Sequence, residues 1–577
     1  MNYHQILTQT IASTRQDVLL FMPELLLCGT ILLMLLVRLF NFARRLDMFW
    51  IALVGSLAAL TYALPWNPAN AEALKLLETA GTGRHELFTG MLVYDSFTVF
   101  FRSLLTFFAV LFVLLCKLTG IPDKDDSPDF YTLVLGAIVG MCLMASVNHL
   151  FMVFMAVELA SVPSYALAGY LKGRRQSSEA SLKYVVYGAG TAGIMLYGIS
   201  LLAGVTGSAH LPTVTAQLAA MLGLGIDGGT LMVLVLAGLM ISVGIAFKLS
   251  AVPFHFWCPD VFEGASAEVN ALLSVASKSA ALALLVRVVV GLGTLPAGSQ
   301  VALYAPPQQS VAMAQENIVP ASSGGRRVER VQKAAEPVRL MTGPGALDAL
   351  APVRDFTYLL VAIMAAVTCT FGNLAAYGQT NIKRLLAYST IAHAGYMMMP
   401  VAAGIYLMGT DAELARRAFA SLLVYAGIYL FMNLGAFAIV AFLRNAMGSE
   451  QISDYAGLVR VVPWTSFFLA VILFGLIGIP PLAGFIGKFA IFEALVRAEM
   501  YVLFAIGGVN TVIALFYYMR VIKLMMIDPE PEDRLPFALP MLSVGYAGLV
   551  SLPVLLLIFQ WNGLYELCSA ACRHLVP

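Results

Sequence analysis

Five charged side chains stand inside long apolar runs of this sequence: Glu158, Lys183, Lys248, Lys278 and Lys488. A charge at the centre of a bilayer costs about 2.5–3.5 kcal/mol on insertion scales, so several together indicate a use. Burial in a low dielectric favours the neutral amine of a lysine, whereas a nearby carboxylate favours its ammonium. At roughly 5 Å and an effective dielectric near 20, that attraction is about 3 kcal/mol. The set therefore predicts a proton relay in which a moving carboxylate switches a lysine between holding and releasing a proton.

Two of these lysines lie beside predicted helix breaks. Lys248 occurs in GIAFKLSAVPFHFW, where Pro253 removes a backbone bond to the carbonyl of Leu249 and ends the helix one residue beyond the lysine. Lys488 follows the prolines and glycines of GIPPLAGFIGKF. Freed carbonyls at membrane depth are tolerated only where they line a cavity or water. Each lysine is therefore expected beside broken backbone near the middle of the bilayer.

Several site residues have simpler alternative roles. Lys183 opens its predicted helix and could extend to the membrane interface. Glu158 could form a structural ion pair, and its expected partner is Lys183 or Lys248. His255 and His393 occur in the same segments and could pass protons through water, or could simply be hydrogen-bonded packing residues.

The composition excludes a soluble protein. Hydrophobic residues make up 60% of the 577 residues, charged residues only 12%, and the mean hydropathy is +0.84. Soluble globular domains carry about 25% charged residues. The net charge of +1 indicates no nucleic-acid partner. Two of the seven cysteines, Cys568 and Cys572, occur near His574, but without the spacing of a zinc motif, so neither a metal site nor a cofactor-binding residue is expected.

Apolar runs long enough to cross a bilayer predict an all-α integral membrane protein with about fourteen transmembrane helices. The predicted helices cover residues 18–38, 48–66, 94–116, 130–147, 149–171, 183–205, 230–260, 266–291, 355–377, 383–406, 418–443, 463–498, 500–526 and 536–560. The seventh and the twelfth are too long or too interrupted to be single straight rods.

An internal repeat relates residues 130–170 to residues 356–396, and Lys248 to Lys488. Each copy holds five predicted helices, an odd number, so the second copy must be inverted in the membrane. Two inverted five-helix repeats, each with a broken helix, are a transporter architecture. The predicted divisions are a three-helix segment (1–129), the first repeat (130–291), a long extramembrane loop (292–354), the inverted second repeat (355–526), and a C-terminal helix and tail (527–577).

The distribution of lysine and arginine predicts the orientation. These residues gather in the short loops and helix ends that follow the odd-numbered helices, which places those loops in the cytoplasm and both termini outside. The 292–354 loop is basic and is nevertheless assigned to the outside, because long loops translocate largely regardless of charge. Its prolines, glycines and serines predict no core of its own.

The chain resembles the antiporter-like membrane subunits of bacterial NADH–quinone oxidoreductase, respiratory complex I. The resemblance covers essentially the whole chain, and any one of its motifs is shared with related antiporter subunits. The motifs are VELASVPSYALAGY (157–170), EASLKYVVYGAG (179–190), AFKLSAVPFHFWCPDVFEGA (246–265), NIKRLLAYSTIAHAGYM (381–397) and GIPPLAGFIGKF (478–489). In that family a glutamate of helix 5 and lysines of helices 6, 7, 8 and 12 form the proton path; these positions match Glu158, Lys183, Lys248, Lys278 and Lys488.

Within this family the resemblance favours the subunit N branch. The chain lacks the long lateral helix of subunit L, it carries Lys488 where subunit M has glutamate, and it has the first three helices typical of bacterial members. The 292–354 loop is longer than the family usually has, so its contacts cannot be carried over.

The resemblance implies a proton-translocating subunit of NADH:quinone oxidoreductase in the bacterial inner membrane, driven by quinone reduction elsewhere. NADH, FMN, iron–sulfur clusters and quinone would be held by other subunits. This agrees with the sequence, which has no cysteine cluster, Rossmann fingerprint or bis-haem histidine pair. The implied partners are the neighbouring subunit M, the small subunits K and J, the lateral helix of subunit L, and lipid. The alternatives are a subunit of a multi-subunit cation/proton antiporter and a passive membrane scaffold.

Overall fold

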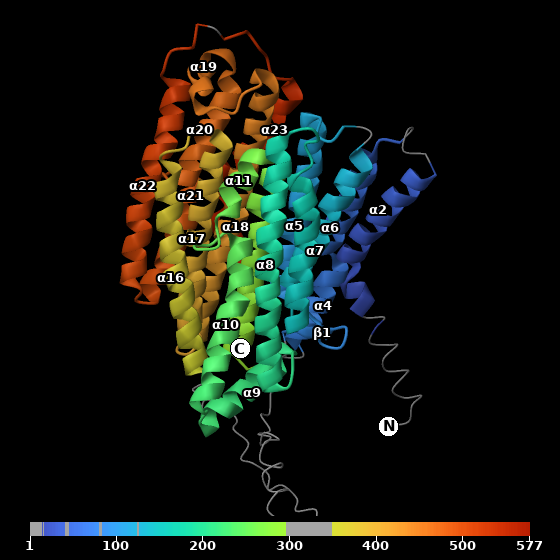
Figure 1. Cartoon of the computed structure of the whole chain (residues 1–577), viewed down its shortest axis with the longest axis vertical. Helices are drawn as coiled ribbons and strands as arrows, with labels where there is room; N and C mark the ends of the chain where they lie inside the picture. Colours follow the sequence, from blue (N-terminus) through green and yellow to red (C-terminus); the bar gives the residue numbers. More distant parts are fainter. Residues whose placement is uncertain are drawn as a thin grey trace, which may run out of the picture.

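The computed structural model describes residues 14, 17–40, 46–79, 83–123, 126–295, 349–532 and 534–576. Most helices run along the long axis of the molecule and form one bundle (Figure 1). The first part of the chain is α2 (Met22–Leu39), α3 (Met48–Ala63), α4 (Pro68–Thr79), β1 (His85–Leu87), β2 (Leu92–Tyr94), α5 (Ser96–Thr119), α6 (Ser127–Ala145), α7 (Leu150–Ala168), α8 (Arg175–Thr206) and α9 (Leu211–Leu224). The middle part is α10 (Gly228–Leu249), α11 (Trp257–Gly264), α12 (Ala267–Ala271), the π-helical turn η2 (Leu272–Ala276) and α13 (Ser277–Gly293).

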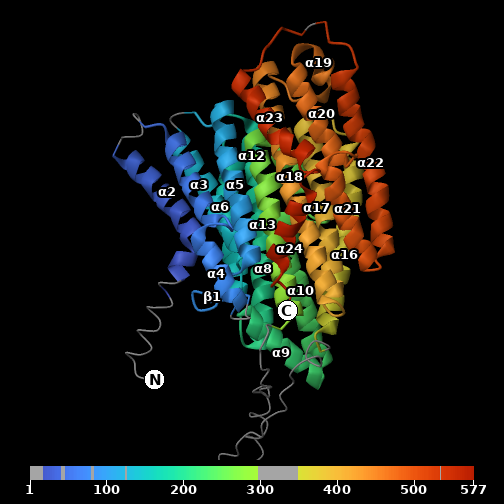
Figure 2. The ribbon, with the colours of Figure 1, turned by 180° about the vertical axis from the view of Figure 1, so that it is seen from behind.

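The last part is α16 (Ala351–Ala376), α17 (Ile382–Leu407), α18 (Ala412–Met447), the 3₁₀ turn η3 (Ile452–Tyr455), α19 (Leu458–Val461), α20 (Pro463–Ile477), α21 (Ala483–Arg497), α22 (Tyr501–Met526), α23 (Met541–Leu556) and α24 (Trp561–Cys572). Nearly every residue of α17 and of the membrane part of α18 is buried, so these two helices form the core of this half of the bundle. Helix α17 packs against α13, and α18 packs against α24 (Figure 2).

The helical membrane fold is confirmed. Ten helices of the described residues are long and apolar enough to cross a membrane, or eleven when α23 and α24, which meet at 87°, count as one broken span. A helix or a broken helix lies at each of the fourteen predicted positions, but some, such as α3 and α20, are short. The count of fourteen spans therefore stays a prediction.

Side-chain caps and left-handed glycines set many of the helix ends. The carboxylates of Asp95 and Asp227 accept hydrogen bonds from the Thr98 and Thr230 amides, which satisfies a free donor at the start of α5 and of α10. Gly120 ends α5 with φ +74°, a conformation that glycine adopts without a steric penalty. These local signals fix where the spans begin and end.

Both predicted helix breaks are confirmed. Helix α10 ends at Leu249, one residue beyond Lys248, and α11 begins only at Trp257. Helix α20 ends at Ile477 and α21 begins at Ala483, five residues before Lys488. A Cβ on Gly484 would lie 1.9 Å from the carbonyl oxygen of Gly475, so the close approach of the two half-helices requires glycine there.

Four described segments depart from the predicted helix pattern. Residues 85–94 form a two-stranded antiparallel hairpin in which His85 pairs with Tyr94. Short helices α4 and α9 lie in stretches expected as loops, and α9 sits at the lower end of the view in Figure 1. The expected C-terminal tail holds helix α24, whose Cys568 and Cys572 are buried against neighbouring helices. Most of the predicted 292–354 loop, residues 296–348, lies outside the described residues.

The first helices of the two predicted repeats run in opposite directions. The Asn445 amide bonds the Thr119 carbonyl, and the Ile382 amide bonds the Glu450 carbonyl, so the ends of α5, α16 and α18 share one end of the bundle. Helix α6 begins at that end, whereas α16 finishes there. Inverted repeats require this opposition; the repeat itself stays a prediction.

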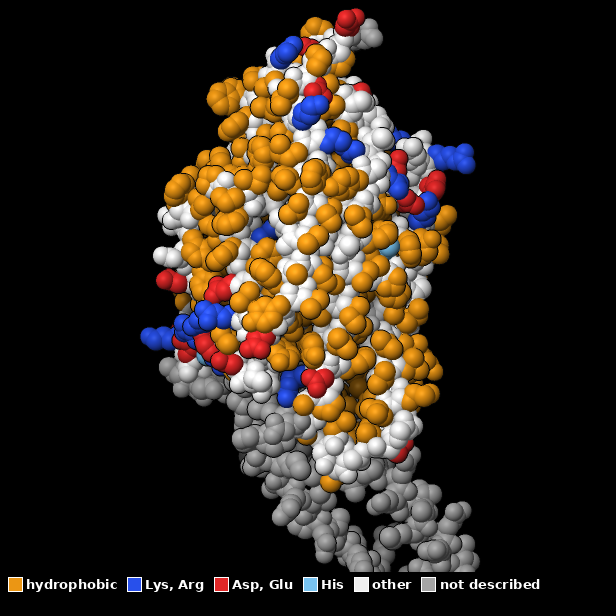
Figure 3. Space-filling view, turned by 90° about the vertical axis from the view of Figure 1, so that its left-hand side faces the viewer, with side chains coloured by type: hydrophobic (Ala, Val, Ile, Leu, Met, Phe, Trp, Pro, Cys, Tyr) orange, Lys and Arg blue, Asp and Glu red, His pale blue; other side chains and the backbone are white. Residues whose placement is uncertain are grey.

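The lateral surface is apolar. Figure 3 shows hydrophobic side chains over most of one side, with charged side chains gathered mainly toward the two ends. Exposed Trp66 and Trp464 lie at the end of α3 and at the start of α20. Tryptophan is enriched where a membrane protein meets the headgroup region. The surface thus suits a lipid surrounding.

Candidate functional site

Lys488 is held against the broken backbone of the second repeat. Its side chain is 2% exposed, and its Nζ donates a hydrogen bond of 3.0 Å to the carbonyl oxygen of Ile477, the last residue of α20. The ammonium also lies 4.4 Å from the centre of the Tyr396 ring on α17, within cation–π distance. The break therefore supplies the acceptor that the sequence predicted.

Lys248 occupies the corresponding place at the end of α10. It is 1% exposed, and its Nζ lies 6.0 Å from the centre of the Tyr184 ring. That ring stacks on Trp257, the first residue of α11, with centres 4.3 Å apart, and the Trp257 indole donates to the Phe247 carbonyl. Aromatic contacts thus join both sides of this break.

Glu158 lies half-buried on α7, close enough to Lys248 for their charges to interact. Among the described residues, Glu158 makes no direct ion pair with Lys248 or Lys183, and one of its carboxylate oxygens has no hydrogen-bond partner. Of the two predicted partners of Glu158, Lys248 is the one whose charge is close enough to interact with it. Lys183 instead bonds other carboxylates.

Lys278 begins α13 directly after the π-helical turn η2. It is fully buried, and within the described part of the chain its ammonium has no hydrogen-bond partner. A π-helical turn frequently marks a functional position because it displaces side chains from the regular helix register. His255, from the loop between α10 and α11, is buried within charge-interaction distance of Lys278 and packs on the Phe371 ring.

His393 lies in a buried cluster of hydroxyl groups between Lys278 and Lys488, near enough to both for charge interaction. Its Nδ1 lies 2.7 Å from the Tyr425 hydroxyl and its Nε2 lies 3.3 Å from the Tyr518 hydroxyl. Tyr518 in turn hydrogen-bonds the Ser389 hydroxyl. The sequence indicated His393 but not these tyrosines, because an apolar helix gives no signal of which ring points inward.

Lys183 lies apart from the buried row. Its side chain is 38% exposed, and its Nζ lies 2.7 Å from Asp260 on α11 and 3.0 Å from Glu179 one turn earlier. Arg384, at the start of α17, bonds the other oxygen of Asp260 at 2.9 Å. The structure therefore brings Lys248, Lys278, His393 and Lys488 into the interior, and leaves Lys183 at one end of the bundle.

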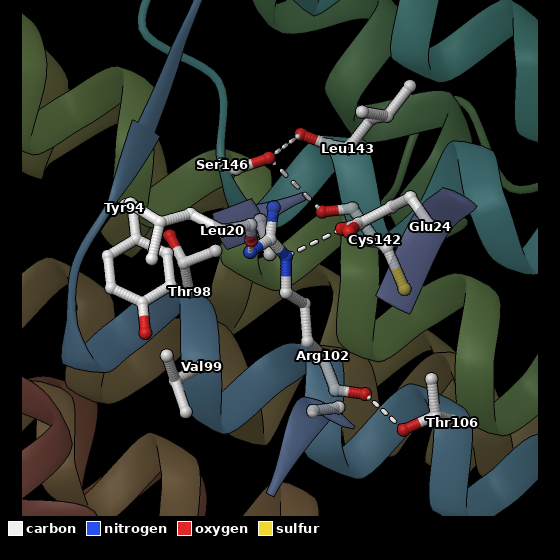
Figure 4. Close-up of polar contacts among 12 residues, drawn as sticks. Leu20, Glu24, Tyr94, Thr98, Val99, Arg102, Thr106, Cys142, Leu143 and Ser146 are labelled. Carbon is white, nitrogen blue, oxygen red and sulfur yellow. Dashed lines mark hydrogen bonds and ion pairs between the residues drawn. The ribbon is translucent and has the colours of Figure 1, made fainter. Parts of the chain in front are cut away.

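A second buried charge pair lies in the N-terminal helices. Arg102 on α5 and Glu24 on α2 are 1% and 0% exposed, and Arg102 Nε lies 2.5 Å from Glu24 Oε1 (Figure 4). The guanidinium also donates to the Leu20 carbonyl at 3.0 Å and lies 5.9 Å from the Tyr94 ring centre. The criterion that found the lysines, charge within an apolar run, would also have found this pair.

Arg287 forms another buried pair, at the opposite end of the bundle from Lys183. Its guanidinium bonds both oxygens of Asp95 and the Thr98 hydroxyl. Burial alone would raise the pKa of the Asp95 carboxyl, but the Arg287 guanidinium holds it below its ordinary value. Within the described residues no group of three histidine, cysteine, aspartate or glutamate side chains is arranged to bind a metal ion.

The sequence matches the profile of a family described as NADH:quinone oxidoreductase/Mrp antiporter, transmembrane, over residues 147–303 and 346–514. A relative from Anaeromyxobacter sp., named NADH-quinone oxidoreductase subunit N, is 35% identical over 97% of both chains. The subunit N of Rhodospirillum rubrum is 36% identical over 92% of this chain and 93% of its own length.

Solved structures agree with this relationship. A chain of respiratory complex I from Thermus thermophilus with bound aureothin is 26% identical, with a TM-score of 0.64 over 94% of this chain and 98% of that one. A chain of the Mrp complex from Dietzia sp. has the same fold, with a TM-score of 0.72 at 17% identity over 98% of each chain. With the membrane bundle, the two broken helices and these relatives together, the chain belongs to the NADH-quinone oxidoreductase subunit N family of antiporter-like membrane proteins.

Proposed function

We propose that this chain translocates protons as a membrane subunit of an NADH–quinone oxidoreductase, a translocase in which quinone reduction by other subunits drives the transfer. The names of the relatives support this assignment, and the membrane fold is consistent with it. NADH, FMN, iron–sulfur clusters and quinone would be held by those other subunits, and this chain would carry no redox chemistry.

The observation that carries the proposal is the buried row of Lys248, Lys278, His393 and Lys488. Each of these side chains is at most 4% exposed. Charged groups at this depth are costly and are usually kept for ion or proton pathways. A passive scaffold has no use for them.

The chemistry follows from the surroundings of each group. The Ile477 carbonyl and the Tyr396 ring stabilise the protonated form of Lys488. Within the described residues, the ammonium groups of Lys248 and Lys278 have no hydrogen-bond partner. Whether these lysines hold a proton therefore depends on neighbouring charges, such as Glu158 beside Lys248. His393, which has two ring nitrogens, can accept a proton on one and release it from the other toward Tyr425 or Tyr518. His255 and Lys183 would extend the path toward the ends of the row.

We infer that the protein lies in the bacterial inner membrane, with the Lys183 end facing the cytoplasm and both termini in the periplasm. Its proposed neighbours are subunit M, the small subunits K and J, and the lateral helix of subunit L. The alternative assignment, a subunit of a multi-subunit cation/proton antiporter, is favoured only by the shared family profile and fold. Mass spectrometry of the subunits that purify with this chain decides between the two.

The decisive experiment replaces Lys248 and Lys488 by arginine in the assembled complex in vesicles. Arginine keeps its charge at any accessible pH, so it can preserve the local field but cannot release a proton. Both variants should pump fewer protons per NADH oxidised, and the defect should be larger for Lys248→Arg, where Glu158 would hold a permanent cation. Methionine at either position should also impair pumping. If both arginine variants pump at the wild-type ratio, the lysines are not carriers.

A further inference from the structure

A cluster of charges joins three helices at the end of the bundle where Lys183 lies. Lys183 comes from α8, Asp260 and Glu263 from the half-helix α11, and Arg384 from the start of α17. One Asp260 oxygen lies 2.7 Å from the ammonium of Lys183, and the other lies 2.9 Å from the guanidinium of Arg384. Asp260 is therefore the one member of the cluster that bonds both cations.

Glu263 offers a comparison within the same half-helix. It bonds Arg384 at 2.6 Å, and Lys183 is bonded instead by Asp260 and Glu179. The side chains of Lys183, Asp260, Glu263 and Arg384 are 28–38% exposed. Ion pairs with this exposure typically contribute only about 0–1 kcal/mol to stability. The ion pairs of Asp260 therefore contribute little to the stability of the fold.

A further carboxylate, Glu158, lies on the neighbouring helix α7. Helices α7 and α8 pack antiparallel, with the Ser181 hydroxyl bonded to the Tyr165 carbonyl and Gly188 packed against the Tyr165 ring. This register places Glu158 deeper in the membrane than Lys183, by roughly one to two helical turns of about 5.4 Å each. Lys183 therefore bonds Asp260 and Glu179 at this end of the bundle, whereas Glu158 lies deeper, within charge-interaction distance of Lys248.

We propose that Asp260 is a positioning residue that holds the ammonium of Lys183 at the outer end of the path. Because Asp260 belongs to the half-helix beyond the Lys248 break, a shift of α11 relative to α8 would change the distance between Asp260 and Lys183. This inference rests on the proposed proton translocation, and it assigns a role to a residue outside the row of buried groups.

The test is proton flux and NADH oxidation as a function of pH, with the assembled complex in vesicles. Asp260→Asn keeps the side-chain shape but removes the charge that favours the ammonium of Lys183. Flux per NADH should fall several-fold, and the alkaline limb of the pH profile should move to lower pH by roughly one unit. The other charges of the cluster, namely Glu179, Glu263 and Arg384, are unchanged, and so are Glu158 and Lys248 deeper in the bundle. Asp260→Glu should restore most of the flux.

Glu263→Gln is the matched control, because it removes an acid from the same half-helix and leaves the bond to Lys183 in place. It should keep the wild-type pH profile. In a Lys183→Met background, Asp260→Asn should add no further defect. Equal effects of Asp260→Asn and Glu263→Gln would show that the cluster merely docks α11, and an additive effect with Lys183→Met would show that Asp260 acts elsewhere. If Lys248→Arg and Lys488→Arg both pump at the wild-type ratio, the carrier role on which this inference rests fails first; if those variants are impaired and Asp260→Asn is normal, this inference alone is wrong.

Discussion

The three interior lysines are equally buried, but their neighbours differ. Lys488 has a carbonyl acceptor at 3.0 Å and an aromatic face at 4.4 Å, so its charged form is stabilised by fixed dipoles. Lys248 has an aromatic ring at 6.0 Å and a carboxylate on another helix, so its charge depends on the position of that helix. Lys278 is joined to the row through His255 and His393. These differences predict different responses to substitution along one path.

Tyr425→Phe tests the hydroxyl cluster around His393. The substitution removes the 2.7 Å contact between the Tyr425 hydroxyl and Nδ1 and keeps the ring that stacks on the imidazole. Losing one hydrogen bond typically costs roughly 0.5–1.5 kcal/mol, so proton flux should fall by about two- to tenfold with the complex still assembled. Tyr358→Phe is the control, because that ring lies on α16 outside the cluster. Unchanged flux in Tyr425→Phe would exclude this hydroxyl from the path.

At the scale of elements, the described part of helix α2 is joined to the bundle by one buried ion pair, Glu24 with Arg102, and by one exposed pair, Arg38 with Asp129. Many of the leucines of α2 are exposed on its lipid-facing side. Only 28% of this span is buried against the rest of the bundle. The pair of Glu24, in the first turn of α2, with Arg102 joins this helix to α5 (Figure 4). A buried ion pair is weak evidence for net stability, but loss of a single partner leaves an uncompensated charge.

Arg102→Met should therefore destabilise the attachment of the N-terminal helices by about 3–5 kcal/mol, whereas Glu24→Leu combined with Arg102→Met should recover most of that loss. The measurement is the temperature at which the purified complex loses this subunit, with limited proteolysis to follow release of α2. Equal destabilisation by the single and the double variants would contradict the ion-pair explanation, because it would assign the loss to packing alone.

At the scale of the whole molecule, the two broken helices lie in separate halves of one bundle and the buried row connects them. Helix α17 contributes His393 and Tyr396 to the buried row and its surroundings. The first turn of α17 holds Lys383 and Arg384, which contact α11 and the turn that follows it. The bundle therefore links the first half-helix break to the second through one buried helix. This arrangement is consistent with coupling between the two predicted repeats.

The basic segment between the two predicted repeats should be dispensable for pumping. The prolines, glycines and serines of residues 292–354 and their lack of apolar periodicity predict that the segment has no core of its own. Its described ends nevertheless hold buried residues, such as Leu350 and Arg354, so the shortening leaves them in place. Replacing residues 300–344 by a short glycine–serine linker should leave proton flux per NADH within about twofold of wild type, because entropy of closure changes slowly with loop length. Failure of the shortened chain to assemble with its partners would identify the segment as a docking arm.

The sequence alone determined the membrane class, the positions of the spans and both helix breaks, because these depend on local properties. Apolar length decides what can cross a bilayer, and proline or glycine ends a helix wherever it falls. For the same reason the buried positions of Lys248, Lys278 and Lys488 followed from their apolar neighbours. The short helices α4 and α9 were missed because they are not long enough to give a span signal.

Only the tertiary structure decided which groups meet. Glu158 was expected to pair with Lys183 or Lys248, and it lies near Lys248, whereas Lys183 bonds Asp260, 77 residues away, because α11 folds back against α8. The Tyr425 hydroxyl reaches His393 across 32 residues, and Glu24 reaches Arg102 through the packing of α2 on the bundle. Each of these contacts depends on the rotation and register of two helices, and nearly uniform apolar faces leave both undefined in the sequence. Tertiary packing fixes them, and with them the order of groups along the proposed proton path.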